Sequence, residues 1–165
     1  MPDTVQDCKA WTEDTPEHAL IVSNIIGLLH ERLKGTPCKP FGSGLGVTAG
    51  GKVVHPDVAV LCPPVQCDSR RPEAVRNPRV VFEVRSPATE AYDWSEKFAL
   101  YRQCEGFLEY VQLSSDRVRG ETYSRNANDT LAVRFLGPDD TVRLMSIDCD
   151  IPLSAFYEGM EMLVK

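Results

Sequence analysis

The chain has 165 residues, which fits one domain built around one sizeable core. Hydrophobic residues make up 42% and charged residues 25%, as in ordinary globular proteins, and no apolar run reaches the roughly 20 residues needed to span a bilayer. The net charge of −6 argues against broad, nonspecific binding to nucleic acid, although it leaves room for a local basic patch.

The N-terminus has no basic head followed by an apolar stretch, so we expect no secretion signal and a cytoplasmic location. The six cysteines are therefore expected to be reduced. Cys62 and Cys67 are the closest pair, but no second pair or histidine spacing matches them. Buried thiols are thus a better interpretation of the cysteines than a zinc site.

The first predicted element is a helix that begins at Pro16. Thr15 is a suitable N-cap, Pro16 suits the first turn, and Glu17 suits the positive end of the helix dipole. Gly35 is a typical C-terminal stop. Between these ends the apolar residues recur at helical spacing, namely Val22, Ile25, Ile26, Leu29 and Leu33.

Strands and one further helix are predicted for the rest of the chain. Glycine-rich residues 42–52 indicate turns around a short strand, and alternating valines predict a strand over 52–62. A proline-rich loop then leads to a strand over 79–86, and a helix over 89–106 ends at Gly106. Four more strands and a short last helix follow, over 107–114, 117–124, 130–137, 141–147 and 153–159.

This order of elements predicts an α/β (α+β) fold, with one mixed sheet flanked by helices. We expect residues 1–15 to form a polar N-terminal arm and residues 16–165 to form a single domain.

Two acidic residues occupy the predicted strands. Asp57 and Glu83 lie 26 residues apart, and their carboxylates can emerge on one face of the sheet if the two strands pair. Carboxylates brought together repel each other, and a divalent cation relieves that repulsion. Lys97, on the following helix, could lie beside such a cation and orient or deprotonate a water molecule.

These motifs resemble those of the Uma-two family of restriction endonuclease-like proteins, in the PD-(D/E)XK nuclease superfamily. The family pattern has a Pro-Asp that opens a strand, then Glu-Val-x-Ser-Pro-x-Thr, then an Asp and a Lys four residues apart on a helix, then a Tyr, a Gly and an aromatic strand. The matching residues here are Pro56, Asp57, Glu83, Val84, Ser86, Pro87, Thr89, Asp93, Lys97, Tyr101, Gly106 and Tyr110.

The resemblance implies a restriction-endonuclease-like core and the hydrolysis of DNA with Mg²⁺ or Mn²⁺. Asp57, Glu83 and the Val84 carbonyl would be metal ligands, Glu17 would be a helper ligand, and Lys97 would be the catalytic lysine. Cutting a duplex usually needs two active sites, so we expect a homodimer, in which the stretch 107–113 could form part of the contact.

Arginines supply candidate contacts to substrate phosphates, at Arg76, Arg79 and Arg85. Arg85 leaves an alternative open, because it could neutralise Glu83 and compete with the metal. The protein would then be an inactive nuclease-fold module that binds nucleic acid or protein. A hydrolase of small phosphate esters is the other alternative.

The three histidines are not expected to bind the metal. His55 is interpreted as a wall residue on the face of Asp57, because a hard cation prefers oxygen ligands. His18 and His30 are interpreted as residues on the surface of the first helix.

Overall fold

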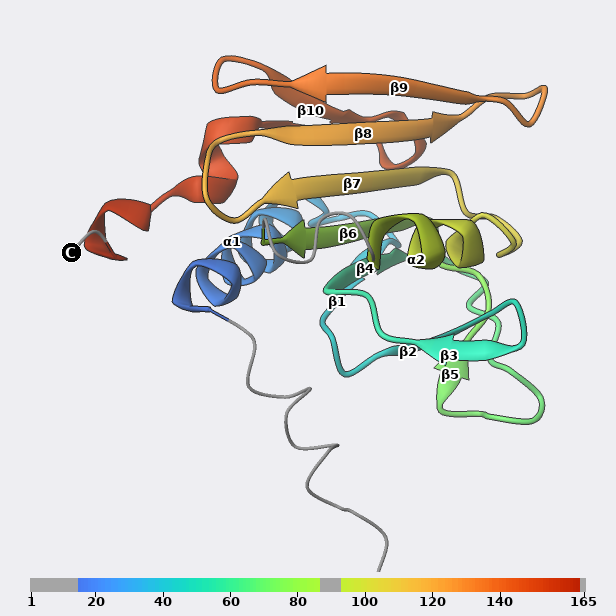
Figure 1. Ribbon diagram of the computed structural model, residues 1–165. Helices are drawn as coiled ribbons and strands as arrows, with labels where there is room; N and C mark the ends of the chain where they lie inside the picture. The colour runs from blue at the N-terminus through green and yellow to red at the C-terminus, as the bar shows by residue number, and fades with distance from the viewer. Residues whose placement is uncertain (1–14, 87–92, 164–165) are drawn as a thin grey trace, which may run out of the picture.

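The computed structural model describes residues 15–86 and 93–163, with the side chains of 93–95 outside the description (Figure 1). Its main sheet has six strands in the order β1-β4-β6-β7-β8-β9. Only β6 and β7 pair in parallel; the other neighbours are antiparallel. The strands are β1 (Lys39–Phe41), β4 (Val58–Leu61), β6 (Val80–Arg85), β7 (Glu109–Ser114), β8 (Gly120–Arg125) and β9 (Leu131–Leu136).

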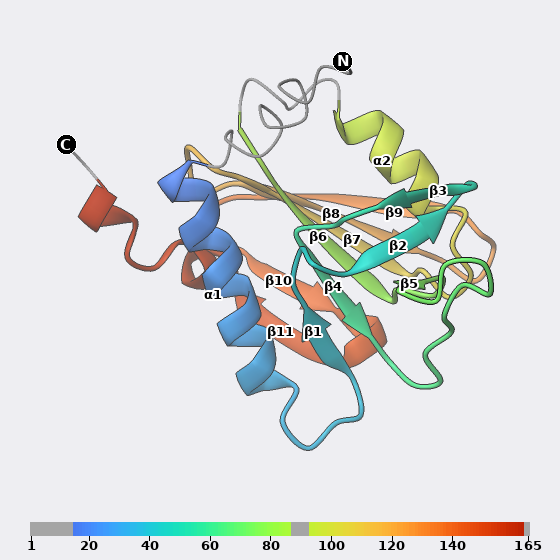
Figure 2. The same cartoon turned by 90° about the horizontal axis from the view of Figure 1, so that it is seen from below.

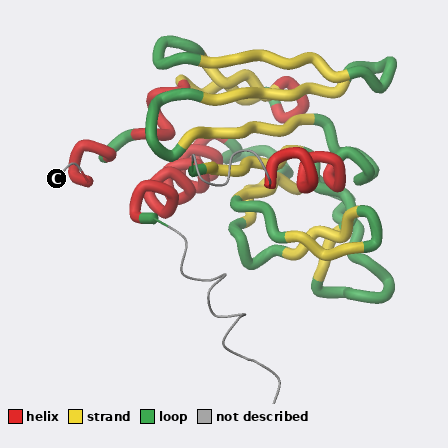
Figure 3. Tube along the Cα trace, viewed as in Figure 1, coloured by secondary structure: helices red, strands yellow, loops and turns green. Residues whose placement is uncertain are grey.

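Two smaller sheets complete the β structure (Figure 3). One has the order β3-β2-β5, and the other is a pair formed by β10 and β11. Short 3-10 helices follow β10 and β11. The bounds are β2 (Gly46–Ala49), β3 (Lys52–Val54), β5 (Ala74–Val75), β10 (Thr141–Leu144), β11 (Cys149–Pro152), η2 (Met145–Ile147), η3 (Leu153–Tyr157) and η4 (Met160–Leu163).

Helix α1 (Pro16–Arg32) covers one face of the main sheet, together with β10 and β11 (Figure 2). Its N-cap is Thr15, as the sequence predicts, and the Thr15 side chain accepts a hydrogen bond from the His18 backbone. The residues that it buries, Ile21, Ile25 and Leu29, lie three and four apart and so share one helix face. They pack on inward-facing side chains of β4, β6 and β7.

Helix α2 (Asp93–Tyr101) covers the opposite face (Figure 2). The Phe98 ring lies 5.0 Å from the ring of Tyr110 and 4.9 Å from that of Tyr123, measured between centroids. These aromatic contacts fix the helix across β7 and β8. The predicted class, a mixed sheet flanked by helices, is therefore confirmed.

The prediction of a single strand over 52–62 is wrong in one respect. The structure divides this stretch into β3 and β4, which belong to different sheets. Pro56 lies in the break and has no N–H to donate to a ladder. The split separates His55 from Asp57: His55 Nδ1 lies 3.1 Å from the Ser43 carbonyl oxygen, and Asp57 directly precedes β4.

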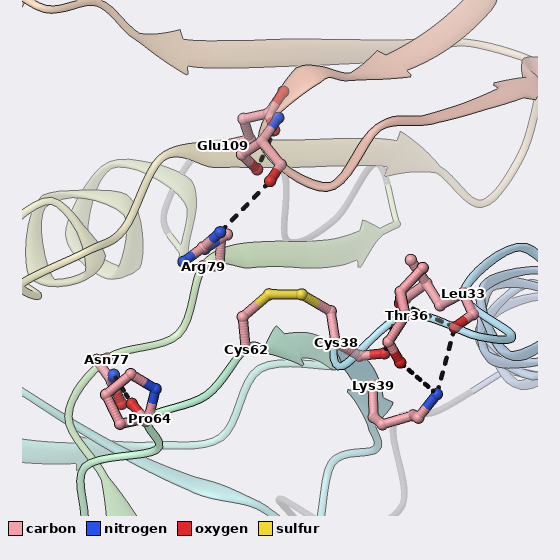
Figure 4. Close-up of a disulfide and its surroundings, with 10 residues drawn as sticks. Leu33, Thr36, Cys38, Lys39, Cys62, Pro64, Asn77, Arg79 and Glu109 are labelled. Carbon is pink, nitrogen blue, oxygen red and sulfur yellow. Dashed lines mark hydrogen bonds between the residues drawn. A yellow bond between two sulfur atoms is a disulfide. The ribbon is translucent and has the colours of Figure 1, made fainter.

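Two cysteines are joined in a disulfide, so the expectation of reduced thiols is wrong for this pair. Lys39 pairs with Leu61 in the β1–β4 ladder, which places Cys38 opposite Cys62 at a Cα–Cα distance of 4.2 Å (Figure 4). The two residues are 24 positions apart, and only the strand register brings them together. Cys67, Cys104 and Cys149 are free thiols.

Strand β7 lies in the interior of the main sheet and is buried from Glu109 to Leu113. Its backbone groups are taken up by β6 and β8, so the expectation that the stretch 107–113 meets a second subunit is wrong. The expected N-terminal arm lies outside the described residues, apart from Thr15. In the described part of the chain no helix is long and apolar enough to cross a bilayer.

Candidate active site

Asp57 and Glu83 face each other across neighbouring strands. In the antiparallel β4–β6 ladder, Val58 pairs with Phe82 and Val60 pairs with Val80. Asp57 is the residue before Val58, and Glu83 is the residue after Phe82. The same register, continued by one residue, therefore places Asp57 opposite Glu83. Opposed residues of an antiparallel pair project on the same face of the sheet. This is the face that α2 covers, because Val81, two residues before Glu83, packs in the α2 cluster.

Each carboxyl group has one oxygen held by donors from the protein. Asp57 Oδ2 accepts a hydrogen bond from the Val84 backbone N–H at 2.8 Å and lies 3.1 Å from His18 Nε2. Glu83 Oε1 accepts one from the Tyr101 hydroxyl at 3.0 Å, and Lys97 Nζ lies 3.5 Å away. Within residues 15–86 and 93–163, no N–H group donates to Asp57 Oδ1 or Glu83 Oε2. These two oxygens are left for a shared proton or a cation.

The strand register also explains why the Val84 carbonyl is available. Val84 lies two residues beyond Phe82, the last residue of β6 that pairs with β4, and Pro56 lies two residues before its partner Val58. The N–H and C=O of one strand residue point to the same side, and the Val84 N–H points to Asp57. Proline has no N–H, so Pro56 cannot occupy the Val84 carbonyl. Pro56 therefore offers no backbone donor to the Val84 carbonyl, which stays a candidate metal ligand.

The two acids have very different proton affinities. Burial and the charge of Asp57 raise the pKa of Glu83 to about 8, against the opposing effects of Lys97 and Tyr101. Burial on its own would raise the pKa of Asp57, but hydrogen bonds from His18 and Val84 and the charge of His18 hold that pKa below its ordinary value of 3.8. At neutral pH the pair therefore carries one proton, and Asp57 is the ionised member.

Lys97 and Tyr101 reach Glu83 together because they lie four residues apart on one face of α2. Tyr101 is fully buried, and burial together with Glu83 raises the pKa of its hydroxyl, so it remains a donor. The Lys97 side chain is 34% exposed and that of Glu83 only 6%. The ammonium group thus lies between the buried acid and the solvent, where an incoming anion would meet it.

The donor set fits a hard divalent cation. Magnesium-type ions take one or two carboxylates and keep several waters, and prefer oxygen to nitrogen or sulfur. Two carboxyl groups meet here, with a proton held on Glu83 first by burial and then by the charge of Asp57, and the Val84 backbone, which donates to Asp57 Oδ2, lies next to them. In the described part of the chain, no three His, Cys, Asp or Glu side chains gather as a fuller metal site.

His18 is the contact that the sequence interpretation missed. The structure brings it, and not the neighbouring Glu17, to Asp57. A signal was present in the sequence: His18 is three residues before Ile21 and seven before Ile25, so it continues the buried stripe of α1. Glu17 instead lines an open pocket of about 600 Å³, together with Thr15, Ser86, Ser115, Asp116, Met160, Glu161 and Leu163.

The three candidate arginines do not gather at the acid pair. Arg85 is 5% exposed and donates to the Tyr110 hydroxyl at 2.8 Å, whereas Glu83 accepts from Tyr101. Arg79 precedes β6, four residues and roughly 13 Å from Glu83, and donates to the Ser146 carbonyl at 3.4 Å. Arg76 donates to the Gln66 side chain at 3.2 Å.

Comparison with known sequences decides the family. The sequence pattern of Uma2, described as "Putative restriction endonuclease", matches residues 11–154. The chain belongs to the Uma2 family. This Uma2 chain is also 29% identical, over 145 residues, to an uncharacterised protein of Synechocystis sp., covering 87% of this chain and 75% of that protein.

The Uma2 chain also resembles a solved structure, described as a "putative nuclease belonging to DUF820" from Anabaena variabilis. The TM-score is 0.71 at 14% identity, and the match covers 87% of this chain and 82% of that one. At this identity the likeness concerns the fold alone, and it confirms the restriction-endonuclease-like core. The description of the family therefore points to a nuclease, and the fold agrees with it.

Proposed function

We propose that this Uma2 protein is a metal-dependent endonuclease that hydrolyses phosphodiester bonds in DNA. Asp57, Glu83 and the Val84 carbonyl would hold Mg²⁺ or Mn²⁺, with Glu17 as a helper ligand from the start of α1. The observation that carries the proposal is the opposed pair of Asp57 and Glu83, with Lys97 Nζ 3.5 Å from the Glu83 carboxyl. A purely structural role gives no reason to bury two acids against each other.

The protein's own residues supply the rest of the chemistry. When bound, the cation would polarise a phosphoryl oxygen and make a nearby water more acidic. Lys97 would orient the attacking water and stabilise negative charge on the phosphoryl group as the water oxygen bonds to phosphorus and a P–O bond breaks. Tyr101, by donating to Glu83 Oε1, restricts the rotation of that carboxyl group.

Substrate binding and assembly are part of the same proposal. Arg85 would contact the phosphate next to the cleaved bond, and Arg76 and Arg79 would contact phosphates farther along the duplex. Two copies would act on the two strands as a homodimer, in the cytoplasm, where DNA is accessible to the protein.

Plasmid cleavage tests the proposal. Supercoiled DNA incubated with the protein and Mn²⁺ or Mg²⁺ should become nicked and then linear, and chelation should stop the reaction. Asp57→Asn and Glu83→Gln should each lower the rate by two orders of magnitude or more. Asp139→Asn, at an exposed position, is the matched control and should cut normally. Calorimetric titration with Mn²⁺ that gives no heat in the wild type would contradict the proposal.

The alternative of a catalytically inactive binding module is favoured by one observation, the burial of Arg85. A 5% exposed guanidinium that donates to Tyr110 cannot reach a phosphate without moving. A module would bind DNA or a protein with no dependence on Mn²⁺. Cleavage of small phosphate esters but not of plasmid would instead indicate the third candidate, a hydrolase of small substrates.

A further inference from the structure

The His18 side chain is mostly buried and contacts Asp57, so His18 is not a helix-surface residue. It is the third residue of α1, and its backbone N–H is fixed by the Thr15 cap at 3.2 Å. Its side chain is 17% exposed, and its Nε2 lies 3.1 Å from Asp57 Oδ2, whose side chain is 18% exposed. The contact joins α1, on one face of the main sheet, to an acid that pairs with Glu83 on the other face.

The contact falls on only one of the two carboxylate oxygens. Asp57 Oδ2 receives both the Val84 N–H, at 2.8 Å, and His18 Nε2. Two neighbours on Oδ2 fix the rotation of the carboxylate about its Cβ–Cγ bond, while Oδ1 accepts no N–H from the described residues. A ligand carboxylate held in this way by hydrogen bonds loses less freedom when a cation binds, which favours the bound state.

We infer that His18 is a positioning residue that orients Asp57 for the divalent cation, and this inference rests on the proposed function. The imidazole is not itself a ligand, because its Nε2 is directed at Asp57 and hard cations prefer oxygen. His18 donates an N–H to Asp57 Oδ2 and thereby leaves Asp57 Oδ1 for the cation. Its own position is set by the apolar stripe of Ile21 and Ile25, which anchors α1 on the sheet.

The test is calorimetric titration of the full chain with Mn²⁺ alone, for the wild type and three variants. His18→Ala removes the N–H and should weaken Mn²⁺ binding by about 10-fold or more, within the range found when such outer partners are lost. His18→Gln keeps an N–H donor of similar reach and should restore the affinity to within about threefold of the wild type. His30→Gln, an exposed histidine on the last turn of the same helix, should change nothing.

The outcomes separate the two levels of the proposal. Wild-type protein that gives no Mn²⁺ signal overturns the cation site and His18's role with it. Wild-type binding that His18→Ala leaves unchanged overturns the positioning role alone. The positioning role is also overturned if His18→Gln binds Mn²⁺ as weakly as His18→Ala while its circular dichroism spectrum and melting curve match those of the wild type. An N–H donor at this position would then not be enough to restore Mn²⁺ affinity. If the Ala variant fails to fold, the comparison of His18→Gln with the wild type decides: an affinity loss of about 10-fold or more contradicts positioning, and a near-normal affinity supports it.

Discussion

Asp57, directly before β4, lies across from Glu83 on the antiparallel neighbour β6, yet one acid is held ionised and the other protonated. Burial and Asp57 raise the pKa of Glu83 to about 8, and donors from His18 and Val84 lower that of Asp57. The pair resembles other carboxylate dyads that share one proton because two adjacent charges cannot both persist. A divalent cation would replace that proton.

Cation binding is therefore expected to depend on pH. Below pH 8 the proton on Glu83 must leave before both acids can act as ligands. Mn²⁺ affinity should rise by up to about tenfold per pH unit toward pH 8 and then level off. Titrations at pH 7 in buffers of different ionisation enthalpy should show about one proton released per cation. An affinity that is constant between pH 6 and 8 would show that Glu83 is not a ligand.

Glu83→Gln should stabilise the metal-free protein at high pH while abolishing Mn²⁺ binding. The pKa of Glu83 is about 8 in the folded chain against an ordinary 4.5, so the folded state holds the extra proton and wild-type stability falls as pH rises between these values. Glutamine does not titrate and still accepts from Tyr101. At pH 9 the variant should have a higher free energy of unfolding than the wild type, by a few kcal/mol at most. A pKa difference of one unit between the folded and unfolded chain corresponds to about 1.4 kcal/mol. Urea unfolding at pH 5 and 9 measures this, and equal stability of the two proteins at pH 9 would contradict it.

Lys97→Met should separate catalysis from cation binding. Lys97 Nζ lies 3.5 Å from Glu83 Oε1 but is not expected to be a ligand. We expect plasmid cleavage to fall by roughly 10²-fold, the usual cost of one charge-stabilising donor. Because the Lys97 charge lowers the pKa of Glu83, Mn²⁺ binding should be compared above pH 9, where it should remain. Lys52→Met is the control, since Lys52 is exposed and pairs with Glu96 at 3.8 Å. Cleavage at the wild-type rate by Lys97→Met would exclude the catalytic role.

Much of this site could be predicted from the chain because local rules govern its parts. Capping and periodicity locate α1, and alternation places Glu83 and Arg85 on one strand face. Local rules do not predict the register in which two strands pair. The pairing of Val58 with Phe82 sets Asp57 against Glu83, and the pairing of Lys39 with Leu61 sets Cys38 against Cys62. Both depend on contacts more than 20 residues apart.

The residues that the sequence interpretation misplaced have physical explanations. Arg79 is only four residues from Glu83, but an extended strand carries it roughly 13 Å away, to the other end of the sheet. Arg85 has the correct face for the site, but Tyr110, from the parallel neighbour β7, takes up its guanidinium. His18 is interpreted from the sequence as a helix-surface residue, but its spacing from Ile21 places it on the buried stripe.

The disulfide should contribute measurably to stability under oxidising conditions. It joins residues 24 positions apart and ties the edge strand β1 to β4, which leads from Asp57. Closing a loop of this length stabilises a protein by about 3 kcal/mol through the entropy of the unfolded chain. Cys38→Ser should lower the free energy of unfolding by about that amount, and Cys67→Ser, at an exposed free thiol, should not. If a reducing agent leaves the wild-type melting curve unchanged, the bond is not formed in solution.

The proposed homodimer needs a contact surface, and β9 is the edge strand of the main sheet with the more exposed apolar side chains. It is the last strand of the main sheet, and Val133 and Phe135 on one of its faces are 47% and 72% exposed. An edge strand with exposed apolar side chains offers unpaired backbone groups and apolar area to a second copy. We expect the wild type to be a dimer at micromolar concentration by light scattering, and Phe135→Lys to shift it toward monomer.

A matched control separates an interface from a general loss of apolar surface. Met145 is 82% exposed in η2, and its backbone N–H donates to Glu109 of β7, so Met145→Lys should leave a dimer through β9 intact. Plasmid linearisation should fall more than nicking in Phe135→Lys, because a monomer carries one acid pair and cuts one strand at a time. A wild type that is monomeric at micromolar concentration and still linearises plasmid would remove the reason for a dimer. Equal loss of dimer in both lysine variants would exclude β9 as its specific contact.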